Sequence, residues 1–210
     1  MAESRLDEIL GRLHSLQDEL EGELERIYEE KRDSFQYTLE KRKVRFKTKI
    51  RAFQRQHKKG LIKFFVDAEI KHIISAPIVY SIIFPLIFLD IFITIYQHIC
   101  FRVYGIPLVK RNRYIIIDRQ HLGYLNIIEK LNCMYCGYGN GLMSYGTEII
   151  ARTEQYWCPI KHANKVLGAH RLSENFVDYG DVEAYRENLV SMRDMIATAN
   201  NKTNNTPKDV

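Results

Sequence analysis

The chain has 210 residues, of which 46% are hydrophobic and 27% charged, and its formal net charge is +5 at pH 7. This length accommodates one domain with appendages or two small domains. Four cysteines, three of them in metal-type spacing, exclude a secreted disulfide framework and indicate a reducing compartment, which in a bacterium is the cytoplasmic side. The charged, polar stretch from Ala2 to Gly60 does not have the pattern of a signal peptide.

The proline-free stretch of residues 5–58 predicts one long helix, either continuous or interrupted. This pattern is clearest in its first half, where apolar residues recur at heptad spacing: Leu6, Leu13, Leu20 and Ile27, with Ile9 and Leu16 at the companion positions. The repeat predicts a coiled coil that self-associates or binds a partner protein. Only about three heptads are regular. An amphipathic helix packed against its own domain therefore stays open as the alternative.

The second half of this stretch is strongly basic. Eleven Lys and Arg residues fall between residues 41 and 63, and an apolar stripe runs through the region: Leu39, Phe46, Ile50 and Phe53. Such a helix lies in the headgroup region of an anionic leaflet. Nucleic acid is a less favoured partner because an apolar segment follows shortly, and a merely solvated helix is the third interpretation. Residues 1–60 thus form a coiled coil and a basic amphipathic helix, with Gly60 as the hinge.

Residues 61–104 are predicted to be the membrane segment. From Ile73 to Phe101 there is one formally charged residue, Asp90, and the length suffices for a tilted span. Pro77 and Pro85 break or kink a helix, and basic residues on both flanks leave the orientation undefined. Two arrangements stay open, a kinked span and a re-entrant hairpin that breaks at Pro85. The hairpin accounts for more of these features, because it keeps both basic flanks in the cytoplasm.

Asp90 and Cys100 lie within the apolar part of this segment. A carboxyl deep in an apolar run is costly, so Asp90 is a candidate functional residue; the alternative is a protonated or hydrogen-bonded carboxyl that ties the two limbs of the hairpin or neighbouring protomers together. Cys100, at the end of the segment, is expected to be a buried apolar side chain.

Residues 105–197 are predicted to form a small cytoplasmic α+β domain. Residues 113–118, RYIIID, have the composition of a short strand. An amphipathic helix follows, marked by Leu122, Leu125, Ile128 and Leu131, and residues 141–157 form a second helix. Because such a domain has a modest core, it needs an additional stabilising cross-link, and a bound metal ion would supply one.

Three cysteines and a histidine are the candidate metal ligands. Cys133 and Cys136 form a C-x-x-C pair followed by three glycines at alternate positions, as in a zinc knuckle. Cys158 and His162 are spaced i, i+4, so they would share one face if the turn after Pro159 is helical. A closed Cys3His site leaves no open coordination position, which favours structural Zn2+ over a catalytic ion. An iron–sulfur cluster on the same ligands and a metal-free dithiol are the alternatives.

Several motifs resemble a family of bacterial membrane proteins to which no activity is attached. They are RYIIIDR at residues 113–119, YCGYGNG at 135–141, ARTEQYWCPIKHA at 151–163 and FVDYGD at 176–181, and the resemblance covers about residues 77–185. It implies a bacterial membrane protein and carries no information about chemistry.

The C-terminal part is predicted to contain a loop at residues 173–181, a helix capped by Asp181, and a disordered tail at residues 198–210. The apolar face of that helix consists of Tyr185, Leu189, Met192 and Ile196. Five aromatic residues near the candidate ligands are expected at the membrane interface, around the metal or in the core: Tyr135, Tyr138, Tyr145, Tyr156 and Trp157.

Together these features predict a mainly α bacterial inner-membrane protein that acts as an oligomeric, non-enzymatic adaptor or scaffold and presents a Cys3His domain to a partner. Two alternatives come from other classes. One is a membrane-bound iron–sulfur electron-transfer protein on the same ligands. The other is an interfacial enzyme on lipid-linked substrates that uses Asp90 or Glu148.

Overall fold

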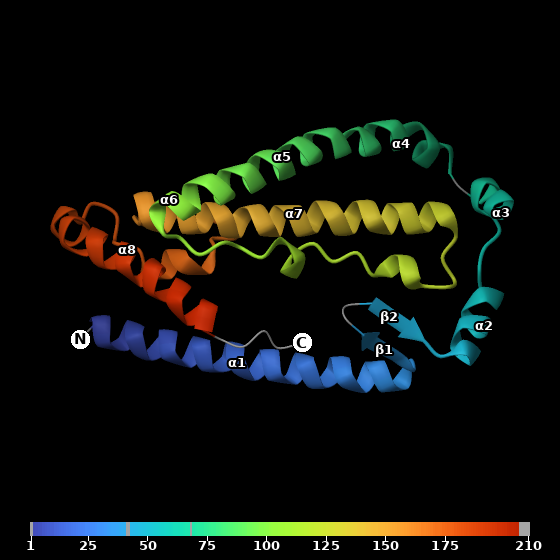
Figure 1. Ribbon diagram of the computed structural model, residues 1–210, viewed down its shortest axis with the longest axis horizontal. Helices are drawn as coiled ribbons and strands as arrows, with labels where there is room; N and C mark the ends of the chain where they lie inside the picture. The colour runs from blue at the N-terminus through green and yellow to red at the C-terminus, as the bar shows by residue number, and fades with distance from the viewer. Residues whose placement is uncertain (1, 41–42, 68, 206–210) are drawn as a thin grey trace. The chain divides into compact units, whose positions relative to one another are not determined.

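The computed structural model describes residues 2–40, 43–67 and 69–205, and the chain divides into two compact units. The first unit contains the chain up to Lys59 together with His121–Asn126, and the second contains Gly60–Gln120 and the chain from Ile127 onward. Helices dominate both (Figure 1). The predicted mainly α class is confirmed.

The first unit consists of α1 (Ala2–Ser34), the strands β1 (Tyr37–Glu40) and β2 (Lys43–Phe46), and α2 (Thr48–Gln56). The prediction of helix was therefore wrong at the two strands, which form an antiparallel hairpin. Tyr37 pairs with Phe46, their ring centroids 5.7 Å apart. The signal lay in the alternation of Tyr37 with Leu39 and of Val44 with Phe46, because period two is the period of a strand.

The second unit begins with α3 (Leu61–Val66). A long helical element follows, which consists of α4 (Ile70–Ser81), α5 (Ile83–Tyr96), a π-helical turn (Gln97–Phe101) and α6 (Arg102–Tyr104). The whole element, Ile70–Tyr104, has 35 residues and is long and apolar enough to cross a membrane.

Pro85 does not reverse the chain. The helix is interrupted only at Ile82, and α5 continues α4 in the same general direction (Figure 1). The interruption has a local cause. A proline removes the hydrogen bond to the carbonyl four residues earlier, and its ring clashes with that carbonyl. For Pro85 this is the carbonyl of Ser81, the last residue of α4. The re-entrant hairpin is therefore wrong for this structure, and the predicted kink is correct.

The long element ends at Gly105, whose φ of 70° is accessible mainly to glycine. The Ile106 amide then donates to the Phe101 carbonyl at 2.8 Å, and Pro107 prevents further helix. Residues 105–120, here called the return segment, run back beside α7 (Figure 1). The expected strand at 113–118 is absent: the segment forms two 3-10 turns, Arg111–Arg113 and Arg119–His121, and is otherwise irregular.

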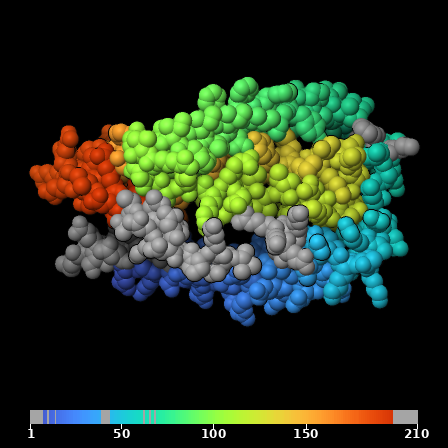
Figure 2. Space-filling view, viewed as in Figure 1, coloured from blue at the N-terminus to red at the C-terminus, as the bar shows by residue number. Residues whose placement is uncertain are grey.

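Helix α7 (Ile127–Trp157) is the centre of the second unit. It runs parallel to α4 and α5: the Tyr135 hydroxyl donates to the Val79 carbonyl at 2.7 Å near one end, and Tyr96 and Thr153 hydroxyls lie 2.9 Å apart near the other. The return segment is antiparallel to α7, because Ile115 lies against Gly141 and Pro107 beside Arg152. Figure 2 shows side chains of α5 and of the return segment meeting in front of the middle of α7.

The glycines of α7 allow these neighbours to approach. A Cβ at Gly141 would lie 2.7 Å from the Tyr114 carbonyl oxygen and 2.8 Å from the Ile115 Cα, so the return segment requires glycine there. On another face, a Cβ at Gly146 would lie 3.1 Å from Ile93 of α5. Small residues commonly permit such close helix packing. The glycine run that suggested a zinc knuckle therefore belongs to a continuous helix.

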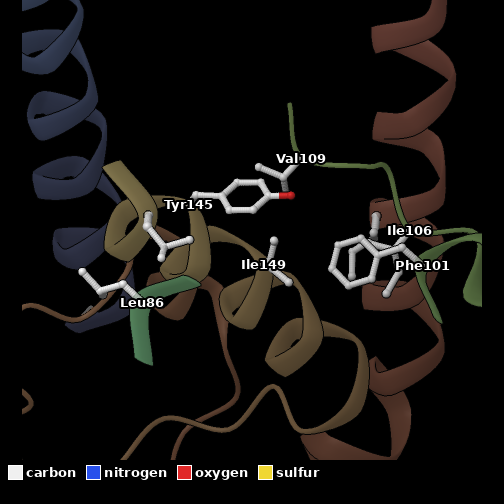
Figure 3. Close-up of a cluster of buried hydrophobic side chains, with 8 residues drawn as sticks. Leu86, Phe101, Ile106, Val109, Tyr145 and Ile149 are labelled. Atoms are coloured by element: carbon white, nitrogen blue, oxygen red, sulfur yellow. The ribbon is translucent and has the colours of Figure 1, made fainter. Parts of the chain in front are cut away.

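The core lies where the two helices meet the return segment, around Leu86, Phe101, Ile106, Tyr145 and Ile149 (Figure 3). It contains one buried amide. The Gln97 side chain is 1% exposed, accepts from the Val109 amide at 3.1 Å, and donates to the Tyr145 hydroxyl. Gln97 thus fixes the return segment on α5 and α7 at once.

The C-terminal part contains a 3-10 turn (Arg171–Asn175) and α8 (Val182–Asn205). The predicted cap is confirmed, since the Ala184 amide donates to the Asp181 carboxylate at 2.9 Å. On the predicted apolar face, Met192 and Ile196 are buried. The helix continues to Asn205, so the tail predicted to be disordered is helical over its first part, and residues 206–210 lie outside the described chain.

Candidate functional site

The structure does not assemble the four predicted metal ligands. Cys133 and Cys136 lie within α7, whereas Cys158 and His162 follow its end. Because α7 is unbroken between Cys136 and Trp157 (Figure 1), its rise of about 1.5 Å per residue separates the two pairs by roughly 30 Å. In this conformation the C-x-x-C pair lies inside a helix and has no turn that would direct backbone amides at the thiolates.

Within the described part of the chain, no group of three or more His, Cys, Asp or Glu side chains is placed to hold a metal ion. All four cysteines are free thiols, with Cys136 and Cys158 exposed. Cys100, expected to be buried, is half-buried. Zinc and an iron–sulfur cluster remain predictions from the sequence that this conformation does not support.

Asp90 belongs to a polar cluster between α5, α7 and the return segment. Arg111 donates to both carboxylate oxygens, at 3.1 Å from Nε and 2.5 Å from Nη2, and the Tyr138 hydroxyl donates at 3.0 Å. The hydrogen bonds to Asp90 raise the pKa of the Arg111 guanidinium above its usual range. Burial and the bond to Asp90 raise the pKa of the Tyr138 hydroxyl. Asp90 is therefore a hydrogen-bonded carboxyl that joins three segments, which are not the two hairpin limbs that the sequence-based alternative named.

Glu148 is likewise engaged. Its Oε1 accepts from Arg152 at 2.7 and 2.9 Å, and Arg152 also donates to the Pro107 carbonyl at 2.7 Å. The side chains of Glu148 and Arg152 are only 14% and 22% exposed. This i, i+4 pair also anchors the start of the return segment.

These two residues lie in the wall of a cavity of about 920 Å3. The cavity is formed by the end of the long helical element, the return segment, α7, the 3-10 turn after residue 170, and α8. Its lining is basic, with one acidic residue, Glu148, and five cationic ones: Arg102, Lys110, Arg113, Arg152 and Arg171. Burial, followed by the charge of Glu148, raises the pKa of the Tyr114 hydroxyl in the same wall. Tyr114 therefore remains a neutral donor at physiological pH.

An aromatic cluster lies at the end of α6 and α7. Tyr104 stacks on Tyr156 with centroids 5.1 Å apart and meets Trp157 edge-on at 5.2 Å. Arg193 of α8 lies over the Tyr156 ring, 4.8 Å from its centroid. Of the other aromatic residues near the candidate ligands, Tyr145 is in the core, and Tyr135 and Tyr138 bond to α4 and α5.

One pair was not foreseen from the sequence. His170 Nε2 lies 2.7 Å from the Glu154 carboxylate, and its ring packs edge-on against Phe176. Both side chains are largely buried. The pair joins α7 to the chain that follows it, and its separation of sixteen residues has no helical or strand periodicity that could have indicated it.

Comparison of the chain with protein-family models, with curated proteins and with solved structures found no match. The interpretation of the site therefore rests on the residues of this chain.

Proposed function

We propose that this chain is a scaffold or adaptor of the bacterial inner membrane, attached through the outward face of α4 and α5 and self-associating through α1. The observation that carries the proposal is an apolar helix face that the rest of the second unit leaves uncovered. On α5 and the π-helical turn after it the inward residues pack on α7, while the opposite face has five residues that are at least 50% exposed: Phe84, Phe88, Phe92, Ile95 and Ile99.

Charge complementarity favours an anionic bilayer as the occupant of this face. Lys63 precedes the long element, and Arg102, Lys110 and Arg113 follow its apolar part. Each Lys or Arg near an anionic leaflet contributes about 1 kcal/mol, and a Phe or Ile side chain removed from water about 1.5–3 kcal/mol. The aromatic cluster of Tyr104, Tyr156 and Trp157 is of the kind that gathers at the membrane–water interface.

The neighbours of α5 favour an orientation along the bilayer surface over a crossing. If α5 crossed the hydrocarbon, the return segment would lie at the same depth, because Arg111 bonds to Asp90 in the middle of the apolar run. Irregular backbone and the exposed Arg111 and Arg113 would then face lipid, which offers no hydrogen-bond partners. A helix lying in the interface immerses only its outward face. That orientation also keeps both basic flanks on one side.

The apolar stripe of α1 supports the self-association. Leu13, Leu16, Leu20 and Ile27 are 39–65% exposed, and the side chain of Leu6 lies outside the described residues. A parallel or antiparallel partner helix would bury these positions in a coiled coil. The scaffold needs no shared metal ion. Asp90 and Glu148 are both held in ion pairs, and no observation favours the electron-transfer or enzymatic alternatives.

Flotation of the full chain with vesicles tests the membrane attachment. The variant Phe88→Asp/Phe92→Asp places two charges on the outward face and should abolish flotation, while Leu167→Asp/Val190→Asp places two charges at exposed apolar positions elsewhere in the second unit and should not. Equal flotation of both double variants would contradict the proposal.

A further inference from the structure

The basic cavity described above has no assigned ligand. Five cationic side chains converge on it from four separate parts of the chain: α6, the return segment, α7 and the 3-10 turn at Arg171. The sequence shows only scattered basic residues at these positions. The fold alone brings them together.

The positive charge of this cavity is largely uncompensated. Glu148 already accepts two hydrogen bonds from Arg152. In the part of the chain that the structure describes, the side chains of Arg102, Lys110, Arg113 and Arg171 bond to no acceptor and form no ion pair, and they are exposed. Guanidinium groups recognise phosphate oxygens through paired N–H donors. An anion with several oxygens would satisfy them.

Most of the remaining lining is apolar and includes Phe101, Ile106, Leu108, Leu172 and Ile196. A ligand that fills the cavity therefore needs an apolar part as well as an anionic one. The cavity lies directly after the apolar helix, since Arg102 and Gly105 both line it, and Gln155 of its wall adjoins the cluster of Tyr156 and Trp157. The cavity therefore adjoins the end of the element that is proposed to lie in the bilayer surface.

We propose that this cavity binds a phosphate-bearing ligand, with Arg113 and Arg171 as its principal phosphate contacts and the headgroup of an anionic phospholipid as the source of the phosphate. The phosphate chemistry follows from the lining alone, whereas the lipid source rests on the proposed membrane attachment. Arg152 donates to Glu148 and to the Pro107 carbonyl and so fixes these two groups in the cavity wall.

The test compares three forms of the full chain: the natural sequence, Arg113→Gln/Arg171→Gln, and a control, Lys165→Gln/Arg186→Gln, that removes the same charge outside the cavity. Binding is measured to phosphatidylcholine vesicles with and without phosphatidylglycerol. We expect the preference of the cavity variant for vesicles with phosphatidylglycerol to fall roughly tenfold, while its binding to phosphatidylcholine alone is retained. The control variant should show the same preference and the same binding to phosphatidylcholine as the natural sequence. Equal preferences in the cavity variant and the control would overturn the proposal.

A second arm measures binding to the protein in neutral detergent by titration calorimetry, with glycerol 3-phosphate and short-chain phosphatidylglycerol as probes. Binding that requires Arg113 and Arg171 would assign the site to a soluble phosphate compound; binding of short-chain phosphatidylglycerol alone would assign it to the lipid. If neither compound binds, the proposed phosphate site is wrong. A chain that binds glycerol 3-phosphate through these arginines but does not float with vesicles would keep the site and overturn the membrane proposal.

Discussion

Arg111 holds both oxygens of the Asp90 carboxylate, with Nε 3.1 Å from Oδ1 and Nη2 2.5 Å from Oδ2. The two residues are 21 positions apart, and the pair fastens the return segment to the middle of the apolar helix. An ion pair of this kind explains why a carboxylate occurs in that run. It leads to the first of five predictions.

Asp90→Asn and Arg111→Gln should each lower the free energy of unfolding by about 1–2 kcal/mol, because a bidentate charged hydrogen bond is lost from a partly exposed site. In a double-mutant cycle the two changes should not be additive. The Lys161–Asp178 pair, in which the Asp178 side chain is 79% exposed, is the control, and its removal should have little effect. Additive losses at Asp90 and Arg111 would show that the pair is not coupled.

Gly141→Ala should destabilise the second unit by about 1–3 kcal/mol, since the new methyl group would meet backbone atoms of the return segment that cannot rotate away. Gly139→Ala is the matched control. Its Cβ would lie 3.4 Å from Leu86 Cδ1, an ordinary contact, so better helix propensity should make it neutral or stabilising by up to about 1 kcal/mol. Denaturant unfolding in detergent measures both, and a reversed order would contradict the packing of the return segment on α7.

Gln97→Leu should cost about 1–3 kcal/mol, because the buried Val109 amide and Tyr145 hydroxyl would lose their partner. Hydrogen exchange gives a local readout. The Val109 amide should exchange much faster in Gln97→Leu, while the Ile106 amide, bonded to the Phe101 carbonyl, should change little. Unchanged protection of Val109 would mean that Gln97 does not hold the return segment.

Leu13→Asp/Leu20→Asp should weaken self-association by at least about tenfold, since two leucines that the proposed coiled coil would bury are replaced by charges in each chain. Ser15→Asp/Gly22→Asp adds the same charge at heptad positions away from the stripe and should leave the oligomer unchanged. Sedimentation equilibrium in detergent distinguishes the two variants. A monomeric natural chain would exclude α1 as a self-association helix.

Chelation should leave the unfolding midpoint of the purified chain unchanged, and Cys158→Ser should behave like the natural sequence, because the exposed Cys158 is far from Cys133 and Cys136. Elemental analysis of protein purified without oxygen is the direct measurement. One zinc or one iron–sulfur cluster per chain, lost in Cys158→Ser, would restore the sequence-based prediction and require α7 to adopt another conformation.

The apolar helix, its kink, the last helix and its Asp181 cap could all be predicted because their signals are local: an apolar run, a proline, and a capping side chain at fixed spacing. The hairpin at residues 37–46 could also have been found, from its alternating apolar residues, but the proline-free helical pattern around it concealed them.

The other features depend on distant contacts. The glycines at 137, 139 and 141 have the same appearance in a metal knuckle and in a packed helix, and only the return segment against Gly141 and Gly137 decides between them. The basic cavity has no sequence signal, because its arginines come from elements whose proximity is set by α7. The cysteine spacing predicts a turn at Cys133–Cys136, and the structure has a helix at that place.

The orientation of α4 and α5 is the central claim, and labelling of single cysteines tests it most directly. In a chain whose four native cysteines are replaced by serine, Val66→Cys and Leu167→Cys introduce thiols at exposed positions before and after the long element. A membrane-impermeant maleimide is then applied to spheroplasts and to inside-out vesicles. The account predicts that both residues react only in inside-out vesicles; reaction of the two from opposite sides would establish a transmembrane helix and contradict it.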